Sequence, residues 1–128
     1  MTTRLLVVDD EQSILLAMRE YLEHRGFRVD CASSPAEAEA LLLGQGAYDV
    51  VIADLRLSAA DAAGGLRLLR RVRERHPSTR TVLLTAYGSP EVEAEARRLG
   101  VDALFAKSHR LEEVASLVRS LAPAVPEA

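Results

Sequence analysis

Residues 50–57, VVIADLRL, determine how the rest of the chain is expected to fold. The run is apolar and rich in β-branched residues, a pattern that predicts a strand buried on both faces of a parallel sheet. Asp54 stands where this strand leaves the sheet, at its carboxyl end. Ligands of open α/β folds bind along that edge, so the position of Asp54 indicates a functional site.

The composition is typical of one globular domain. The chain has 128 residues, of which 48% are hydrophobic and 27% charged, so neither a disordered nor a membrane protein is expected. No apolar run approaches the roughly 18 residues that a membrane span needs. The N-terminal sequence MTTRLLVVDDE does not resemble a signal peptide. We therefore expect a cytoplasmic protein with no membrane partner.

Neither the cysteine content nor the basic residues suggest further chemistry. Cys31 is the single cysteine and lies in a predicted strand, where a buried and inert thiol is expected. The net charge of −3 argues against direct binding of nucleic acid. The arginine-rich run at residues 67–75 spreads around a predicted helix and indicates a solvated face.

Strand-like and helix-like segments alternate five times along the chain. Strands are predicted at residues 4–9, 27–32, 48–54, 80–85 and 102–107, and a helix is predicted after each of them. Ser34, Pro35 and Glu37 form a capping box with proline at the first helical position. Gly26 and Gly100 are stop signals for the helices that precede them.

This alternation predicts an α/β fold, a doubly wound (βα)5 flavodoxin-like sandwich with a parallel five-stranded sheet in the order 2-1-3-4-5. We assign the domain to residues 1–122 and regard residues 123–128 as a tail or linker stub. In this strand order the switch point lies between strands 1 and 3. Asp9, Asp10 and Asp54 are therefore expected to converge on one crevice.

Each of these three acids also has an ordinary structural explanation. Asp10 would serve as a helix cap, Asp9 as a solvated strand end and Asp54 as the start of a turn. Carboxylates a few ångströms apart, however, repel each other and raise each other's pKa values, and a cation relieves that repulsion. Because all the ligands are oxygen atoms, Mg²⁺ is the expected ion.

The fourth and fifth predicted strands end in a hydroxyl and an ammonium group. Thr85 can donate a hydrogen bond to a phosphoryl oxygen, and Lys107 supplies a point charge toward the same group. Taken singly, Thr85 is also explained as a turn former and Lys107 as a surface lysine. Because four of the five strands end in polar groups of these kinds, the combination favours phosphoryl transfer.

The whole chain resembles the receiver domain of two-component response regulators. VVDDE at 7–11, Asp54 in VIADLRL, LLTAYGS at 83–89 and Lys107 in LFAKS match the motifs of that family in order and spacing. The resemblance implies that Asp54 accepts a phosphoryl group from a phosphohistidine on a sensor kinase or phosphotransfer protein. It implies a signalling switch rather than a turnover enzyme.

The same resemblance assigns the metal ligands and the output surface. It implies that Asp10, Asp54 and the main-chain carbonyl of Arg56 ligate Mg²⁺, while Asp9 acts through a metal-bound water. Thr85 and Lys107 would neutralise charge on the phosphoryl group. Contacts with a second copy or a target are expected on the face formed by helix 4, strand 5 and helix 5.

Several positions near the site are expected to modulate it. Ala86 is small and leaves the phosphoryl group accessible. The resemblance implies that Arg56 and Tyr87 lie beside that group and influence its hydrolysis. Leu104 occupies the position of the aromatic switch residue of the family, which puts the usual aromatic rotation in doubt. Strand alternation points Phe105 to the other face, so Tyr87 is the candidate substitute.

Two other departures from the family pattern affect loops. Ser108 follows Lys107 where proline is usual, and we predict a trans peptide there because a cis bond without proline costs about 3 kcal/mol. The loop SAADAAGG after Asp54 lacks the usual proline and is longer than usual. Its residues Ser58 and Asp61 are expected to have no chemical role.

Three other functions were weighed against a phosphoaccepting receiver. A pseudo-receiver that only binds partners would have no need of the intact acids, Thr85 and Lys107. A hydrolase with an aspartyl-phosphate intermediate needs a second acid two residues after the nucleophile, where Arg56 stands. A flavin-binding electron carrier needs a phosphate loop after the first strand, where the acids would repel phosphate. The sequence therefore favours the receiver and leaves its kinase and output undetermined.

Overall fold

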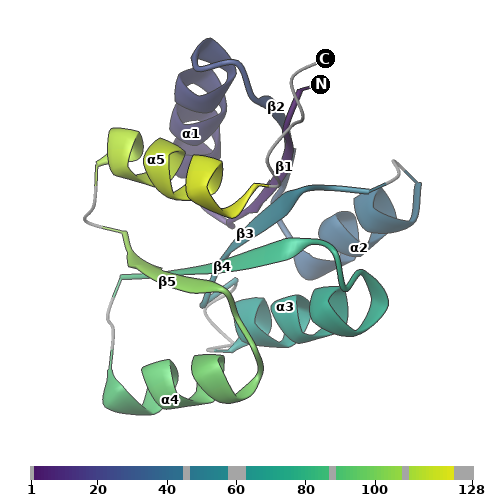
Figure 1. Cartoon of the computed structure of the whole chain (residues 1–128), viewed down its shortest axis with the longest axis vertical. Helices are drawn as coiled ribbons and strands as arrows, with labels where there is room; N and C mark the ends of the chain where they lie inside the picture. The colour runs from purple at the N-terminus through teal and green to yellow at the C-terminus, as the bar shows by residue number, and fades with distance from the viewer. Residues whose placement is uncertain (1, 45–46, 58–62, 87–88, 108–109, 123–128) are drawn as a thin grey trace.

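The structure of the chain, a computed structural model, describes residues 2–44, 47–57, 63–86, 89–107 and 110–122. Its strands are β1 (Arg4–Val8), β2 (Arg28–Ala32), β3 (Val50–Asp54), β4 (Arg80–Thr85) and β5 (Ala103–Ala106). Its helices are α1 (Gln12–His24), α2 (Pro35–Gly44), α3 (Gly64–Arg75), α4 (Pro90–Arg98) and α5 (Leu111–Leu121). All the strands are parallel, in the order β2-β1-β3-β4-β5 (Figure 1). The predicted fold class and strand order are confirmed.

The sheet is covered on both faces, as a doubly wound fold requires. Helices α1 and α5 pack on one face, and α2, α3 and α4 on the other (Figure 1). Along β3, Val50 and Ile52 join the first layer, whereas Val51 and Ala53 join the second. Every residue of this strand is buried. Because each fully buried valine or isoleucine contributes about 1.5–3 kcal/mol, β3 is a firmly held central strand, as its sequence predicted.

The capping box at the start of α2 differs from its prediction in one contact. The Ser34 hydroxyl accepts a hydrogen bond from the backbone N–H of Glu37 at 3.1 Å, as expected. The Glu37 carboxylate instead accepts from the N–H and the hydroxyl of Ser33, at 2.7 and 2.8 Å. The reciprocal half of the box has therefore moved one residue toward the N-terminus, because the Ser33 hydroxyl offers a second donor there.

The two glycine stop signals are confirmed. Gly26 follows α1 with φ of 93°, and Gly100 follows α4 with φ of 80°. Only glycine adopts this left-handed region without strain. After Gly100, the backbone N–H of Val101 donates to the carbonyl of Ala96 at 3.0 Å, the bond that closes such a helix end.

Acids at the amino edge of the sheet are bound to their neighbouring strands. Asp49 precedes β3, and its Oδ2 accepts a hydrogen bond from the Arg4 N–H at 2.8 Å. Asp102 precedes β5, and its Oδ2 accepts from the N–H and the hydroxyl of Thr81 at 2.8 and 3.1 Å. The N–H of Asp102 donates back to the Thr81 hydroxyl at 3.2 Å. These bonds help to fix the register of neighbouring strands.

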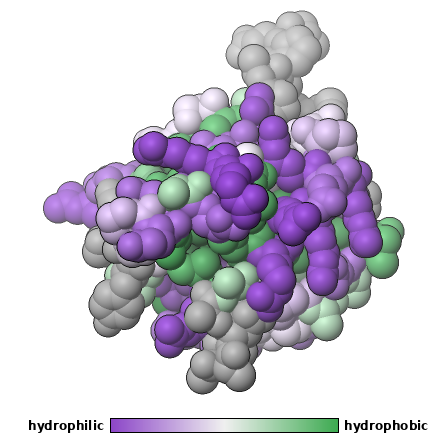
Figure 2. All heavy atoms as spheres, turned by 90° about the horizontal axis from the view of Figure 1, so that it is seen from below, coloured by the Kyte–Doolittle hydropathy of each residue, from purple (hydrophilic) through white to green (hydrophobic). Residues whose placement is uncertain are grey.

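The arginine run lies on the solvated face of α3, as expected. Its five arginines are exposed, whereas Leu66, Leu69 and Val72 face the core. Figure 2 views the molecule of Figure 1 from below, the side on which α3 and α4 lie. Hydrophilic side chains cover much of this face. Arg70 pairs with Glu74 at 3.3 Å, and Arg71 pairs with Glu39 at 2.7 Å.

Several remaining sequence predictions can be placed in the fold. Cys31 is half-buried, and burial raises the pKa of its thiol, which agrees with an inert role. Within the described ranges, none of the helices has the length and apolarity that a bilayer crossing requires. The tail at 123–128, Ser58, Asp61, Tyr87 and Ser108 all lie outside the described residues.

Candidate functional site

Three acids meet at the carboxyl ends of β1 and β3. The two strands are direct neighbours, with Val8 opposite Ala53, so the residues that follow them come together. Asp9 is fully buried, Asp54 is 6% exposed, and Asp10 is exposed. One carboxylate oxygen from each lies within 4.8 Å of the others. The predicted convergence of these acids is confirmed.

Asp9 has one oxygen satisfied and one available. Its Oδ1 accepts a hydrogen bond from the backbone N–H of Glu11 at 2.9 Å. Its buried Oδ2 makes no hydrogen bond within the described part of the chain and has only an ion pair with Lys107. Glu11, not Asp10, is the N-cap residue of α1. The helix-cap explanation of Asp10 is therefore wrong.

The ammonium group of Lys107 contacts three carboxylates. Its Nζ lies 3.1 Å from Oδ2 of Asp9, 3.1 Å from Oδ2 of Asp54 and 3.4 Å from Oε1 of Glu11. It is the only lysine among the 16 lysine and arginine residues of the chain. The backbone N–H of Lys107 donates to the carbonyl of Thr85 at 2.9 Å, which holds the end of β5 against β4.

Burial and crowding shift the ionisation of the site. Burial raises the pKa of Asp9 and of Asp54, and the charges of Asp9 and Asp10 add to the effect at Asp54. Burial by itself would lower the pKa of Lys107, but its hydrogen bond with Asp54 and the nearby charges of Asp9 and Asp54 outweigh that and raise it. Lys107 thus keeps its proton, yet the pKa values of Asp9 and Asp54 are still raised. The site therefore has too little positive charge for its carboxylates.

The donor set fits a hard divalent cation. All three candidate side-chain ligands are carboxylates, and Oδ2 of buried Asp9 has no hydrogen bond. Oxygen-only sites of this kind suit Mg²⁺, which keeps several waters and takes few protein ligands. The main-chain carbonyl of Arg56 as a further ligand stays a prediction.

Thr85 and Ala86 follow one another at the end of β4 and differ in exposure. Thr85 is buried at 4% exposed, and its strand lies directly beside β3. Ala86 is exposed, as is the side chain of Arg56 on the loop after Asp54. A hydroxyl-bearing strand end and a small exposed residue therefore border the acid cluster.

Comparison with known sequences identifies the family. The sequence model of the response regulator receiver domain matches residues 5–119. The chain belongs to the response regulator receiver family. The fold described above is thus that of a receiver domain, and the resemblance found in the sequence is confirmed.

Individual relatives of this receiver differ in length. The alginate biosynthesis transcriptional regulatory protein AlgB of Pseudomonas aeruginosa is 39% identical over 97 residues, 76% of this chain but 21% of AlgB. The sporulation initiation phosphotransferase F of Bacillus subtilis is 25% identical over 96% of both chains. A response regulator structure from Thermotoga maritima is 28% identical, covers 94% of this chain and 98% of its own, and has a TM-score of 0.82.

Gly65 is a residue of the receiver site that sequence reasoning missed. It lies in the first turn of α3, and its N–H donates to the carbonyl of Leu55 at 2.9 Å. A Cβ at this position would lie 1.8 Å from the carbonyl oxygen of Asp54. Only glycine therefore lets α3 begin against the backbone of Asp54. The paired glycines at the end of SAADAAGG were the available signal.

The residues at the expected switch position occupy opposite faces of β5. Leu104 packs against the core layer that includes α4, whereas Phe105 packs against the layer of α1 and α5. The prediction that Phe105 points away from the switch position is confirmed. Leu104, at the expected switch position, is half-buried. The substitute role given to Tyr87 stays a prediction.

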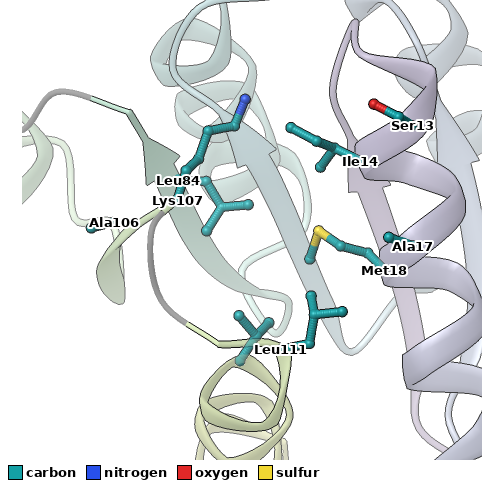
Figure 3. A pocket seen from close by; sticks show the side chains of 9 residues that line it. Ser13, Ile14, Ala17, Met18, Leu84, Ala106, Lys107 and Leu111 are labelled. Atoms are coloured by element: carbon teal, nitrogen blue, oxygen red, sulfur yellow. The ribbon is translucent and has the colours of Figure 1, made fainter.

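A groove opens beside the site, between α1 and α5. Its volume is about 280 Å³, and its apolar lining includes Ile14, Met18, Leu84 and Leu111. Figure 3 shows the side chain of Lys107 at one end of this groove. The acid cluster thus adjoins an apolar surface.

Proposed function

We propose that this receiver accepts a phosphoryl group on Asp54 in a Mg²⁺-dependent reaction and that the added charge changes its conformation. The observation that carries the proposal is the convergence of three carboxylates, two of which contact the only lysine of the chain. Acids that bind no cation gain nothing from such crowding. A site for a divalent ion and a phosphoryl group explains this crowding.

The proposed donor is a phosphohistidine on a sensor kinase or a phosphotransfer protein. A carboxylate oxygen of Asp54 attacks the phosphorus, the P–N bond breaks, and its electron pair stays on the imidazole nitrogen. The apolar groove beside Lys107 offers contact surface to such a donor protein. Asp54 is the nucleophile because it is the buried acid at the end of the central strand.

The metal ligands in this proposal are Asp10, Asp54 and the main-chain carbonyl of Arg56, with Asp9 acting through a water. When bound, Mg²⁺ neutralises charge on the equatorial oxygens of the phosphoryl group. Asp9 orients this arrangement because its Oδ1 is held by the N–H of Glu11 and its Oδ2 faces the cluster.

Lys107 and Thr85 complete the neutralisation of charge. The Lys107 ammonium already lies 3.1 Å from Asp54, so it needs only a small movement to contact a phosphoryl oxygen. Thr85 ends the strand beside β3, and its hydroxyl would donate a hydrogen bond to the phosphoryl group. Ala86 leaves the group accessible, and Arg56 and Tyr87 modulate its hydrolysis.

The conformational change is proposed to pass through β4 and β5. Lys107 and Thr85 are joined by a backbone hydrogen bond, so a shift of either residue displaces the other strand end. Leu104 belongs to β5 and packs against the layer that includes α4. The face of α4, β5 and α5 is therefore the proposed contact surface for a second copy or a target.

Phosphoryl labelling and a phosphoryl analogue test the proposal. With Mg²⁺ and acetyl phosphate, the wild-type protein should become labelled and Asp54→Asn should not, whereas Asp49→Asn, which lies at the opposite edge of the sheet, should label normally. Beryllofluoride with Mg²⁺ should shift backbone NMR resonances around Thr85 and α4. Labelling of Asp54→Asn would reveal another acceptor. A wild-type protein that neither labels nor responds to beryllofluoride would instead support the pseudo-receiver.

A further inference from the structure

Lys107 has three carboxylate partners, and one of them lies outside the expected acid cluster. The side chains of Asp9 and Asp54 are almost completely buried, whereas that of Glu11 is 58% exposed. Glu11 therefore contacts Lys107 from the solvent side. It is the partner that an incoming group meets first.

The backbone of Glu11 is held in place by two sets of bonds. Its N–H donates to Oδ1 of Asp9 at 2.9 Å. Its carbonyl accepts from the N–H groups of Ile14 and Leu15, both at 3.1 Å, as the N-cap of α1. These bonds fix the backbone of Glu11 and leave its side chain to turn about a fixed point. The Glu11 carboxylate consequently stays near the entrance of the site.

Glu11 and a phosphoryl group on Asp54 would compete for the same ammonium. Oε1 of Glu11 and Oδ2 of Asp54 both contact Nζ of Lys107. A phosphoryl oxygen added at Asp54 would therefore lie within reach of the same nitrogen and close to the Glu11 charge. Like charges this close repel each other appreciably at a protein surface.

We propose that Glu11 is a positioning residue that holds the Lys107 ammonium toward the entrance and thereby slows phosphorylation by small, highly charged donors. The inference rests on the proposed phosphorylation of Asp54. A protein donor makes its own contacts with the surface around the site, and that binding energy offsets the repulsion. A small donor makes no such contacts. Glu11 thus favours transfer from a protein partner over transfer from free metabolites.

NMR spectroscopy tests the contact without any phosphorylation. Because Lys107 is the only lysine, lysine labelled with ¹⁵N at Nζ gives a single side-chain ammonium signal. Glu11→Gln should shift this signal and speed the exchange of its protons with water. Glu20→Gln removes an equally exposed charge farther along α1 and should leave the signal unchanged. An unchanged signal in Glu11→Gln would overturn the proposal.

Small phosphodonors of different charge test the consequence. Acetyl phosphate is a dianion at neutral pH, and phosphoramidate carries one net negative charge fewer. Glu11→Gln should raise the rate of labelling by acetyl phosphate about three- to tenfold and that by phosphoramidate by a smaller factor. Glu20→Gln should change neither rate. Equal factors for both donors in Glu11→Gln, or no change, would contradict the proposed role.

The two experiments separate this inference from the proposed function. If the wild-type protein and its variants all fail to label with either donor, the phosphorylation of Asp54 is wrong and the slowing role of Glu11 falls with it. The ammonium signal then still decides whether Glu11 holds Lys107. If labelling occurs and only the charge dependence is missing, the proposed function stands and the role of Glu11 is refuted.

Discussion

Acids lie at both edges of the sheet, and their surroundings differ. At the amino edge, Asp49 accepts a hydrogen bond from the backbone of Arg4, and Asp102 accepts two from Thr81. Each of these acids is matched with donors from a neighbouring strand. They join strands together.

At the carboxyl edge the balance is reversed. Asp9, Asp10 and Asp54 crowd together, and a single ammonium serves two of them and Glu11 as well. The comparison teaches that the number of donors around an acid, more than the acid itself, separates a structural role from a chemical one. Substitutions of the acids themselves should therefore change stability in opposite directions at the two edges.

The largest effect is expected from the shape of the carboxyl edge. Gly65→Ala places a methyl group against the carbonyl of Asp54, and such overpacking should lower the free energy of unfolding by about 3 kcal/mol. Gly44→Ala is the matched control because nothing lies within 4 Å of its Cβ position. Urea denaturation measures both. Equal stabilities of the two variants would show that α3 can move away from Asp54 at little cost.

The next effect concerns the amino edge. Asp102→Ala leaves the N–H and hydroxyl of Thr81 without this acceptor and should cost about 2 kcal/mol in the free energy of unfolding. Asp102→Asn keeps one acceptor oxygen and should cost less. Mg²⁺ affinity, measured by calorimetry, should be unchanged in both variants. A loss of Mg²⁺ affinity would mean that the two edges are coupled.

At the carboxyl edge the sign should reverse. A carboxyl group whose pKa is raised in the folded state contributes stability below its unfolded pKa, and that contribution is lost as pH rises through the raised value. At neutral pH and without Mg²⁺, Asp54→Asn should therefore raise the free energy of unfolding by about 1 kcal/mol.

Saturating Mg²⁺ should erase this gain because it stabilises the wild-type acids. Thermal unfolding at pH 7 with and without Mg²⁺ checks both statements. A variant less stable than the wild-type protein without the ion would mean that the contact with Lys107 outweighs the crowding.

The smallest effect appears only at high pH. Burial raises the pKa of Tyr48, and the hydrogen bond that its hydroxyl donates to Asp30 at 2.6 Å raises it further. Its contribution to stability is complete below pH 10 and is lost as pH rises above the ordinary tyrosine value. Absorbance titration should show one tyrosine that ionises late. Tyr48→Phe should remove that step, and its persistence would assign the late step to another tyrosine.

The part of the site that could be predicted follows from strand order and alternation. Once β1 and β3 are neighbours in a parallel sheet, the acids that follow them must meet, whatever the side-chain details. Alternation along β5 likewise separates Leu104 from Phe105. These features depend on the backbone alone.

The features that sequence reasoning missed depend on contacts between distant elements. The contact between Glu11 and Lys107 depends on the rotamers of two side chains, one at the start of α1 and one just after β5. The need for glycine at position 65 depends on how closely α3 approaches Asp54. The one-residue shift in the partner of Glu37 depends on the Ser33 hydroxyl. Patterns of single residue types do not contain this information.

The place of β5 in the sheet has a mechanical consequence. Asp54 ends a strand that is hydrogen-bonded on both sides, whereas Lys107 follows a strand that is bonded to β4 alone and half-buried throughout. A force between Asp54 and Lys107 therefore acts on β3, which resists displacement, and on β5, which yields more easily. When the charge at Asp54 changes, the central strand should stay in register and the rim should bend. The displacement available to a partner would thus arise at the edge of the molecule, far from the atom that was modified.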